Sequence, residues 1–520
     1  MSRPVSKIFL AVLAISLVLP INAPARSSRS ERILNRQINY LVRKSKMPRT
    51  IMAIEVYSRR SRKIIFNSNS RLLIHPASNL KIITTAFALD SLDVGYKFRT
   101  IFGYQGSHTN GTVDGNIVAI GGGDPILSDS DLSVAAAAIR RDSITYVTGN
   151  LVIDVSKFDS LEWGEGWMWD DEPEPFAMFI TPASVDHNVI SALLSRDSLT
   201  GNISIALQPR SDFVDVICTA TRDTIDSVTA TRRTIKGKNT IIVGGRYSSR
   251  FRPTKYEFSV RHPTEFFGTL FKDALTRAGV TIAGSMSVTR YTPQVTGVKP
   301  LFSIEHSMDT VITYINKESD NLGAECLIRL IAADRFGETG SAENGIKQET
   351  DFLSDCGIDS SQHYIVDGSG VSHYNLITPA AIVKVLRLML NPPDSVRDIF
   401  VRSLPIGGVD GTLSDRMPFD SSSHRILAKT GSINGVSTLS GYAVIPRDTL
   451  VFSMMMESYI GASKAVRDLQ DQLCNILFYY NGSSRSFVRA LRKHRLGTYE
   501  NLPIHKRMAR SQATSKAPHL

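Results

Sequence analysis

Apolar and polar residues follow two different periods along the first ninety residues of the chain. Residues 30–44 carry an apolar stripe with helical spacing, which predicts an amphipathic helix. Residues 51–57 and 64–67 are rich in branched and aromatic side chains on either side of a basic turn, and they predict a β-hairpin. The apolar segment 79–89 predicts a buried helix. The early chain is therefore expected to form a helix, a hairpin and a second helix.

The pattern becomes β-rich between about residues 97 and 290 and helical again after about residue 300. Turn signals such as the glycine-rich stretch at 121–125 separate the short runs. Strands are predicted at 116–120, 150–155, 203–208, 240–244, 281–291, 438–446 and 449–456. Helices are predicted at 308–315, 321–336, 379–390 and 464–480.

Composition and charge exclude several classes of protein. The 520 residues are 42% apolar and 21% charged, which is ordinary for globular proteins and excludes collagen-like, coiled-coil and wholly disordered chains. The net charge of +11 alone would suggest a polyanion partner. However, residues 1–25 hold +2 of it and residues 485–520 hold +8, so residues 26–484 carry only +1. We therefore expect no nucleic-acid partner. The basic tail at 485–520 is expected to be mobile, with contact to an anionic envelope surface as a hypothesis.

The N-terminus has the features of a signal peptide. Arg3 and Lys7 precede an apolar run at 8–19, and the small-residue pattern at 23–25 follows. A run of twelve residues is short against the ~20 that span a bilayer. The sequence therefore predicts export to the periplasm, with cleavage near Ala25.

Four scattered cysteines, Cys218, Cys326, Cys356 and Cys474, do not make a disulfide framework. A disulfide bridge and buried free thiols both remain open as interpretations of these four residues. No cluster of cysteine and histidine suggests zinc.

Three short motifs carry candidate chemistry: Ser78-Asn79-Leu80-Lys81, Ser319-Asp320-Asn321 and Lys429-Thr430-Gly431-Ser432. On a helix, residues three apart share a face, so the first motif brings a hydroxyl and an amine together. A serine is a weak nucleophile until a nearby base takes its proton. Each motif alone is weak evidence, because helix caps and solvated strand ends use the same residues. The three in this order are much more specific.

Together the motifs are the signature of class A β-lactamases and penicillin-binding proteins. The first gap, from Ser78 to Ser319, is 241 residues, and the second, to Lys429, is 110. The long first gap resembles the class C low-molecular-mass penicillin-binding proteins, the D-alanyl-D-alanine carboxypeptidase/endopeptidases of the penicillin-binding protein 4 (DacB) type. The resemblance runs from about residue 30 to 480. Further matching stretches lie at 121–125, 166–171, 367–372 and 410–413.

The resemblance implies an α+β fold. A β-lactamase/transpeptidase-like domain, with helices around an antiparallel sheet, would be split by one or two inserted β-rich domains. The implied boundaries are a signal peptide at 1–25, the first part of the catalytic domain at 26–96, the insertion at 97–290, the second catalytic part at 291–484 and the tail at 485–520.

The resemblance also implies catalytic roles. Ser78 would attack the carbonyl between the terminal D-alanines of a peptidoglycan stem peptide. Lys81, kept neutral by Lys429, would be the general base. Ser319 would relay a proton to the leaving amine, and Asn321 would hold Lys81 and the substrate amide. Penicillins and other β-lactams would acylate Ser78, and the reaction would need no metal or cofactor.

Five further residues would bind substrate. Thr430 and Ser432, with Lys429, would bind the terminal carboxylate, and Gly431 would let the substrate backbone approach. Asp171 would meet the free amine of the third stem-peptide residue. His373 stands where the family often has arginine, so the contact with a substrate side-chain carboxylate is expected to differ.

Two alternatives remain beside an exported serine DD-peptidase. A class A-like β-lactamase would share the motifs but lacks the long insertion. A catalytically weak cell-wall binding protein would retain the fold and grip wall polymer. Fluorescent penicillin labelling separates the three.

Overall fold

The computed structural model describes residues 28–290, 297–336, 339–417 and 425–480. The predicted signal peptide and basic tail lie outside these residues. The described chain divides into two compact units, which are treated separately. The smaller unit comprises residues 28–79, 377–387 and 404–480, and the larger unit comprises residues 80–376 and 388–403.

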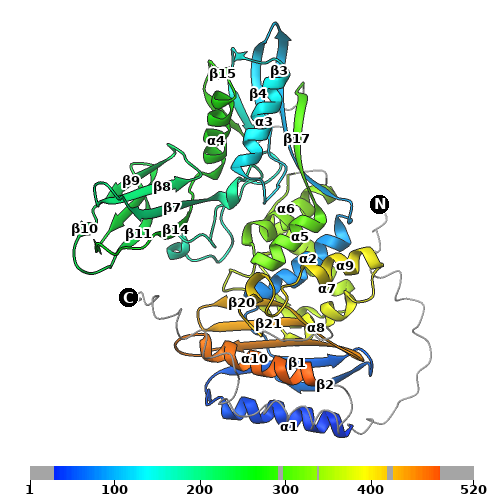
Figure 1. Ribbon diagram of the computed structural model, residues 1–520. Helices are drawn as coiled ribbons and strands as arrows, with labels where there is room; N and C mark the ends of the chain where they lie inside the picture. The colour runs from blue at the N-terminus through cyan, green and yellow to red at the C-terminus, as the bar shows by residue number, and fades with distance from the viewer. Residues whose placement is uncertain (1–27, 291–296, 337–338, 418–424, 481–520) are drawn as a thin grey trace. The chain divides into compact units, whose positions relative to one another are not determined.

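The smaller unit is a five-stranded antiparallel sheet between helices (Figure 1). Its strand order is β2-β1-β22-β21-β20, so strands from the two ends of the chain are neighbours. Its elements are α1 (Arg29–Lys44), β1 (Ile51–Ser58), β2 (Lys63–Ser68), η2 (Ala77–Leu80), α8 (Pro379–Leu388), η6 (Gly411–Leu413), β20 (Arg425–Ile433), β21 (Val436–Ile445), β22 (Asp448–Glu457) and α10 (Lys464–Tyr479).

Both faces of this sheet are buried, which explains why its strands read as nearly continuous apolar runs. On one face, α1 and α10 supply Leu34, Ile38 and Leu473 to a core with the sheet. On the other, the hydroxyl of Tyr442 donates to the Leu386 carbonyl of α8, 2.7 Å away.

The larger unit combines a group of helices with three sheets of three or more strands and with two-stranded pairs (Figure 1). Its helices are α2 (Lys81–Ser91), α3 (Asp129–Arg141), α4 (Pro263–Arg277), α5 (Met308–Glu318), α6 (Asn321–Phe336), α7 (Ala342–Asp355) and α9 (Asp394–Ser403). Four of them, α5, α6, α7 and α9, pack around α2. The burial of nearly all of α2 explains the continuous apolar run that predicted it.

The largest sheet is seven-stranded, and α3 and α4 share its apolar core. Its strands are β3 (Lys97–Thr109), β4 (Thr112–Ile120), β5 (Tyr146–Val147), β6 (Leu151–Asp154), β15 (Thr281–Ile282), β16 (Met286–Thr289) and β17 (Lys299–Ser307). Two three-stranded sheets have the orders β14-β7-β8 and β11-β12-β9. Their strands are β7 (Val189–Arg196), β8 (Ile203–Gln208), β9 (Val214–Cys218), β11 (Thr229–Ile235), β12 (Lys238–Gly244) and β14 (Thr254–Ser259).

Short pieces complete the unit. The strand pairs β10 (Thr221–Arg222) with β13 (Arg246–Tyr247), and β18 (His363–Tyr364) with β19 (Leu376–Ile377), are two residues long. The 3-10 turns are η3 (Trp169–Asp171), η4 (Asp186–Asn188) and η5 (Ser360–Gln362).

The predicted elements are confirmed except for the strand at 281–291. Residue 291 lies outside the described residues. Residues 281–290 contain two short strands, because the strand is interrupted at Gly284, where a Cβ would lie 2.4 Å from the Gly149 carbonyl oxygen. The β-rich pattern also concealed two helices, α3 and α4. The prediction of an α+β fold is confirmed.

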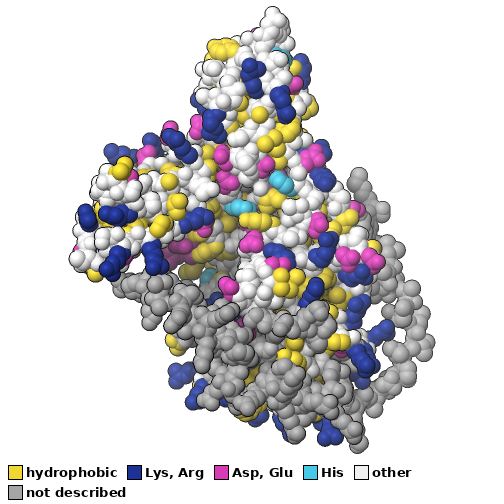
Figure 2. All heavy atoms as spheres, viewed as in Figure 1, with side chains coloured by type: hydrophobic (Ala, Val, Ile, Leu, Met, Phe, Trp, Pro, Cys, Tyr) yellow, Lys and Arg dark blue, Asp and Glu magenta, His cyan; other side chains and the backbone are white. Residues whose placement is uncertain are grey.

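Positive charge is concentrated in one region of residues 26–484, although these residues are nearly neutral as a whole. Residues 196–261 contain twelve Lys and Arg against six Asp and Glu, a net of +6. Figure 2 shows basic side chains gathered over the strands β9 to β11. The exposed members include Arg222, Arg233, Lys236, Lys238 and Arg246.

No disulfide joins the four cysteines, all of which are described. Across the described ranges, no helix is long and apolar enough to cross a bilayer. Likewise, no group of three or more His, Cys, Asp and Glu side chains in them could hold a metal ion.

Replacing Phe271 with alanine should destabilise the larger unit by about 3–5 kcal/mol, since its buried ring packs 4.9 Å from Phe102 and leaves a cavity when removed. Urea unfolding followed by tryptophan fluorescence measures this. Leu199→Ala, at a side chain that is 94% exposed, is the control and should change stability by less than about 0.5 kcal/mol. A loss below about 1 kcal/mol for Phe271→Ala would contradict the packing of α4 on β3.

Candidate active site

Lys81 is the first residue of α2 and is completely buried. Its Nζ donates to Asn321 Oδ1 at 2.5 Å and to the Ser369 carbonyl oxygen at 2.6 Å. Burial lowers the pKa of Lys81 to about 8, against the opposing charges of Asp367, Asp320 and Glu325. At this pKa a minor fraction of the amine is neutral near pH 7, far more than in an exposed lysine.

Asn321 begins α6, and a backbone carbonyl fixes its amide orientation. Asn321 Nδ2 donates to the Phe176 carbonyl oxygen at 2.7 Å, so the amide oxygen is the atom that faces Lys81. The sequence identified Asn321 but gave no signal for Phe176, because a backbone carbonyl is present at every position. This contact links the segment before β7 to the Lys81 centre.

The Ser319-Asp320-Asn321 motif bridges two helices. Ser319 lies at the end of α5 with a left-handed backbone (φ 63°), which is uncommon for a residue with a Cβ. Asp320 Oδ2 accepts from the Gly323 backbone N–H at 2.8 Å, so this aspartate caps the first turn of α6. Asp320 therefore has the helix-capping role that the residues of such a motif often have. Ser319, directly before it, is partly exposed.

His187 lies against the same motif from η4. Its Nδ1 is 3.5 Å from Asp320 Oδ1, and its ring stacks on Tyr314 with centroids 4.8 Å apart. Burial opposes the charged form of His187, but the adjacent Asp320 carboxylate outweighs it and raises the pKa of the ring. Asp186, His187 and Asn188 all have positive φ, a strained run that this packing maintains.

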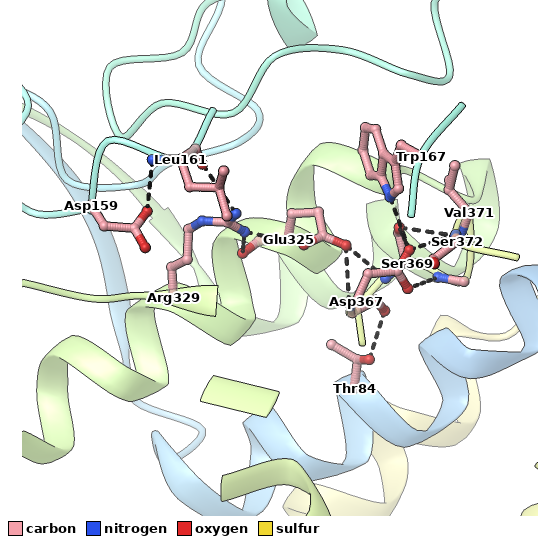
Figure 3. Close-up of polar contacts among 12 residues, drawn as sticks. Thr84, Asp159, Leu161, Trp167, Glu325, Arg329, Asp367, Ser369, Val371 and Ser372 are labelled. Carbon is pink, nitrogen blue, oxygen red and sulfur yellow. Dashed lines mark hydrogen bonds and ion pairs between the residues drawn. The ribbon is translucent and has the colours of Figure 1, made fainter. Parts of the chain in front are cut away.

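A tight loop at residues 367–372 presents the Ser369 carbonyl to Lys81. The Asp367 carboxylate accepts backbone N–H groups of Gly370 and Ser372, both at 2.7 Å, and the Trp167 indole N–H at 2.9 Å (Figure 3). A buried carboxylate with several donors fixes a loop firmly. The stretch 367–372 matches the family in sequence, but the sequence indicates no role for it.

His373 acts electrostatically on Asp171, the other predicted recognition residue. Burial and the neighbouring Asp170 raise the pKa of Asp171, while His373 lowers it. Both side chains are partly exposed.

In the smaller unit, Ser78 lies on η2 and is partly exposed between buried neighbours. Asn79 Nδ2 donates to the Lys429 carbonyl oxygen at 3.0 Å, which ties η2 to β20. Thr438 Oγ1 of β21 donates to the Pro76 carbonyl oxygen at 2.8 Å. The Ser78 turn is therefore fastened to both strands.

Gly431 permits this close approach. A Cβ at Gly431 would lie 2.9 Å from the Ser78 backbone nitrogen and 2.8 Å from the Pro76 oxygen, too close for any real side chain. The lack of a side chain at Gly431 thus allows β20 to pass directly beside the Ser78 backbone. On the same strand, Lys429 is completely buried, and Thr430 Oγ1 donates to Thr412 Oγ1 at 2.8 Å.

Comparison with known proteins agrees with the family that the motifs indicate. The profile of the D-Ala-D-Ala carboxypeptidase 3 (S13) family matches residues 34–478. The D-alanyl-D-alanine carboxypeptidase DacB of Haemophilus influenzae is 26% identical over 408 residues, 76% of this chain and 83% of the relative. The D-alanyl-D-alanine carboxypeptidase of Actinomadura sp. strain R39 is 28% identical over 411 residues, 76% of this chain and 75% of the relative.

Solved structures show the same fold. Penicillin binding protein 4 (dacB) of Haemophilus influenzae superimposes with a TM-score of 0.75 at 23% identity, covering 85% of this chain and 99% of that one. The predicted β-lactamase/transpeptidase-like architecture is confirmed by this match.

Replacing Asp320 with asparagine should lower the pKa of Lys81 below about 8, since the Asp320 charge raises it. NMR titration of ¹³C-labelled lysine side chains, with the Lys81 resonance identified by its loss in Lys81→Met, measures the value. The exposed Asp351→Asn is the control and should leave it unchanged. An unchanged or raised pKa in Asp320→Asn would contradict the electrostatic description.

Proposed function

The chain belongs to the D-Ala-D-Ala carboxypeptidase 3 (S13) family of serine peptidases, and we propose that Ser78 is its nucleophile. The substrate in this proposal is the bond between the two terminal D-alanines of a peptidoglycan stem peptide. The observation that carries the assignment is the buried Lys81, three residues after Ser78, whose pKa of about 8 suits a general base. Burial, rather than Lys429, is the main cause of that value.

The neutral Lys81 amine has the hydrogens and the lone pair that the reaction requires. Asn321 Oδ1 and the Ser369 carbonyl accept its two N–H bonds, and the remaining tetrahedral position carries the lone pair. In the proposed acylation, the lone pair takes the Ser78 hydroxyl proton as Oγ attacks the scissile carbonyl carbon.

The tetrahedral intermediate then collapses to an ester on Ser78. The C–N bond breaks, and a proton relayed through Ser319 goes to the departing D-alanine amine. Water attacks the ester in the second half-reaction, releases the shortened peptide and restores the Ser78 hydroxyl. The backbone N–H groups of Ser78 and Ser432 are proposed to stabilise the oxyanion, a role for which the fixed approach of β20 to η2 is suited.

Substrate recognition is proposed to use two groups of residues. The terminal carboxylate would be bound by Lys429, Thr430 and Ser432 of β20, and Gly431 on the same strand would let the substrate backbone approach. Asp171 would pair with the free amine of the third stem-peptide residue, and His373 would contact the adjoining carboxylate.

The cellular setting is part of the proposal. A signal peptide cleaved near Ala25 would deliver the enzyme to the periplasm, where its substrate lies. The segment 97–290 is proposed to be an insertion in the catalytic domain. The basic residues 485–520 are proposed to contact an anionic envelope surface.

Ser78→Ala should abolish both the covalent adduct with fluorescent penicillin and the release of D-alanine from a pentapeptide ending in D-Ala-D-Ala. Removing a nucleophile of this kind costs about 10³-fold or more in rate. Gel fluorescence and mass spectrometry measure the two effects, with Ser463→Ala, at a serine beside α10, as the control.

The other outcomes identify the alternatives. No adduct on wild-type protein, with retained binding to isolated cell wall, would favour a catalytically weak binding protein. Fast penicillin turnover without release of D-alanine would favour a β-lactamase. An undiminished adduct on Ser78→Ala would contradict the choice of nucleophile.

Asp171→Asn should reduce kcat/KM by about 10-fold for a pentapeptide with a free amine on its third residue, because the charge-assisted contact is lost. The loss should vanish when that amine is acetylated. Asp170→Asn, at the exposed neighbour, is the matched control. Equal losses on both peptides would contradict the proposed contact.

A further inference from the structure

Two buried acids lie near Lys81 without a part in the proposed reaction. Glu325 of α6 and Glu349 of α7 are 1% and 0% exposed. An ionised carboxylate without partners is very costly in such a place. The partners of each group therefore indicate its protonation state.

Glu325 has the partners that an anion requires. Its Oε2 is 3.1 Å from Arg329 Nη1, and its Oε1 accepts from the backbone N–H groups of Gly368 and Ser369 at 2.9 and 3.0 Å (Figure 3). A guanidinium and two amides stabilise the charged form. Glu325 thus holds the loop at 367–372 as a carboxylate.

Glu349 is in a different position. Its Oε1 is 2.9 Å from Thr84 Oγ1, and Oε2 has no hydrogen-bond partner among the described residues. Thr84 Oγ1 is also 2.7 Å from the Gly368 carbonyl oxygen. A hydroxyl has one hydrogen, and a carbonyl can only accept, so that hydrogen is directed to Gly368. The contact with Glu349 then requires a hydrogen on the carboxyl group.

We propose that Glu349 is a protonated, uncharged carboxylic acid and a positioning residue for Lys81. It donates to Thr84, Thr84 donates to Gly368, and the next carbonyl, that of Ser369, accepts from Lys81. Thr84 and Lys81 share a face of α2, so one relay fixes the helix and the loop together. The inference rests on the proposed function, since Lys81 is a base only there.

The neutral state of Glu349 avoids a further negative charge in the surroundings of Lys81. The ionisable groups that face Glu349 are Asp367 and Glu325, both acidic, with Arg329 paired to Glu325. Burial raises the pKa of Glu349 well above its usual range, in agreement with the hydrogen count. A further negative charge here would favour the ammonium form of Lys81 and oppose its use as a base.

Infrared difference spectroscopy of wild type against Glu349→Gln tests the protonation state directly. At neutral pH the wild type should show the carbonyl stretch of a protonated carboxyl group that the variant lacks. A carboxylate band in its place would overturn the proposal. Because this experiment needs no activity, it is independent of the proposed function.

The pH dependence of penicillin acylation tests the positioning role. In Glu349→Gln the new side-chain amide would also donate to Thr84, so the pH midpoint of this variant should match wild type. A downward shift would mean that a negative charge had been removed from beside Lys81, and would overturn the proposal.

Loss of the relay should slow acylation by about 10-fold in Thr84→Val, while Thr84→Ser retains the hydroxyl and the rate. Circular dichroism confirms that each variant is folded. Equal rates for Thr84→Val and Thr84→Ser would refute the relay. If wild type itself forms no adduct, the proposed function fails, and the infrared result still decides the state of Glu349.

Discussion

A completely buried lysine amine is the constraint on which the larger unit depends. Removing an ammonium from water costs several kilocalories per mole unless oxygen acceptors replace the solvent. Here Asn321 and the Ser369 carbonyl replace it, and each is held in turn, the first by Phe176 and the second by Asp367 and Glu325. The start of α6 and the loop at 367–372 together supply the acceptors for this one nitrogen.

The segment before β7 contributes to the same centre, although it belongs to the part that the sequence marks as an insertion. Phe176 orients the Asn321 amide, and His187 lies against Asp320. The strained backbone at 186–188 is maintained by this contact. These residues are therefore structural neighbours of the Ser319-Asp320-Asn321 motif, and sequence variation among them can alter its geometry.

Periodicity predicted most elements, because it is a local property of the chain, and the family resemblance carried by the three motifs predicted the fold class. The prediction failed where local signals were weak or mixed. The helix α3 has a capping pair, Ser128 and Asp131, but sits among β-rich runs. The Ser369 carbonyl that accepts from Lys81 and the Phe176 carbonyl that orients Asn321 leave no trace in a sequence. Glu325 and Arg329 could have been recognised from the sequence, since an acid and a base four residues apart in an apolar helix indicate a buried ion pair.

The order of the five-stranded sheet has a consequence for folding. Ile54 of β1 pairs with Met454 of β22, which lies near the other end of the chain. Closing so long a loop is entropically costly and slow, whereas much of the larger unit is continuous in sequence and can fold earlier. The turn that carries Ser78 is held by hydrogen bonds to β20 and β21, so it becomes fixed only after those strands have been synthesised and have joined the sheet. Ser78 is thus synthesised early, but the turn that carries it is complete only when nearly the whole polypeptide is present.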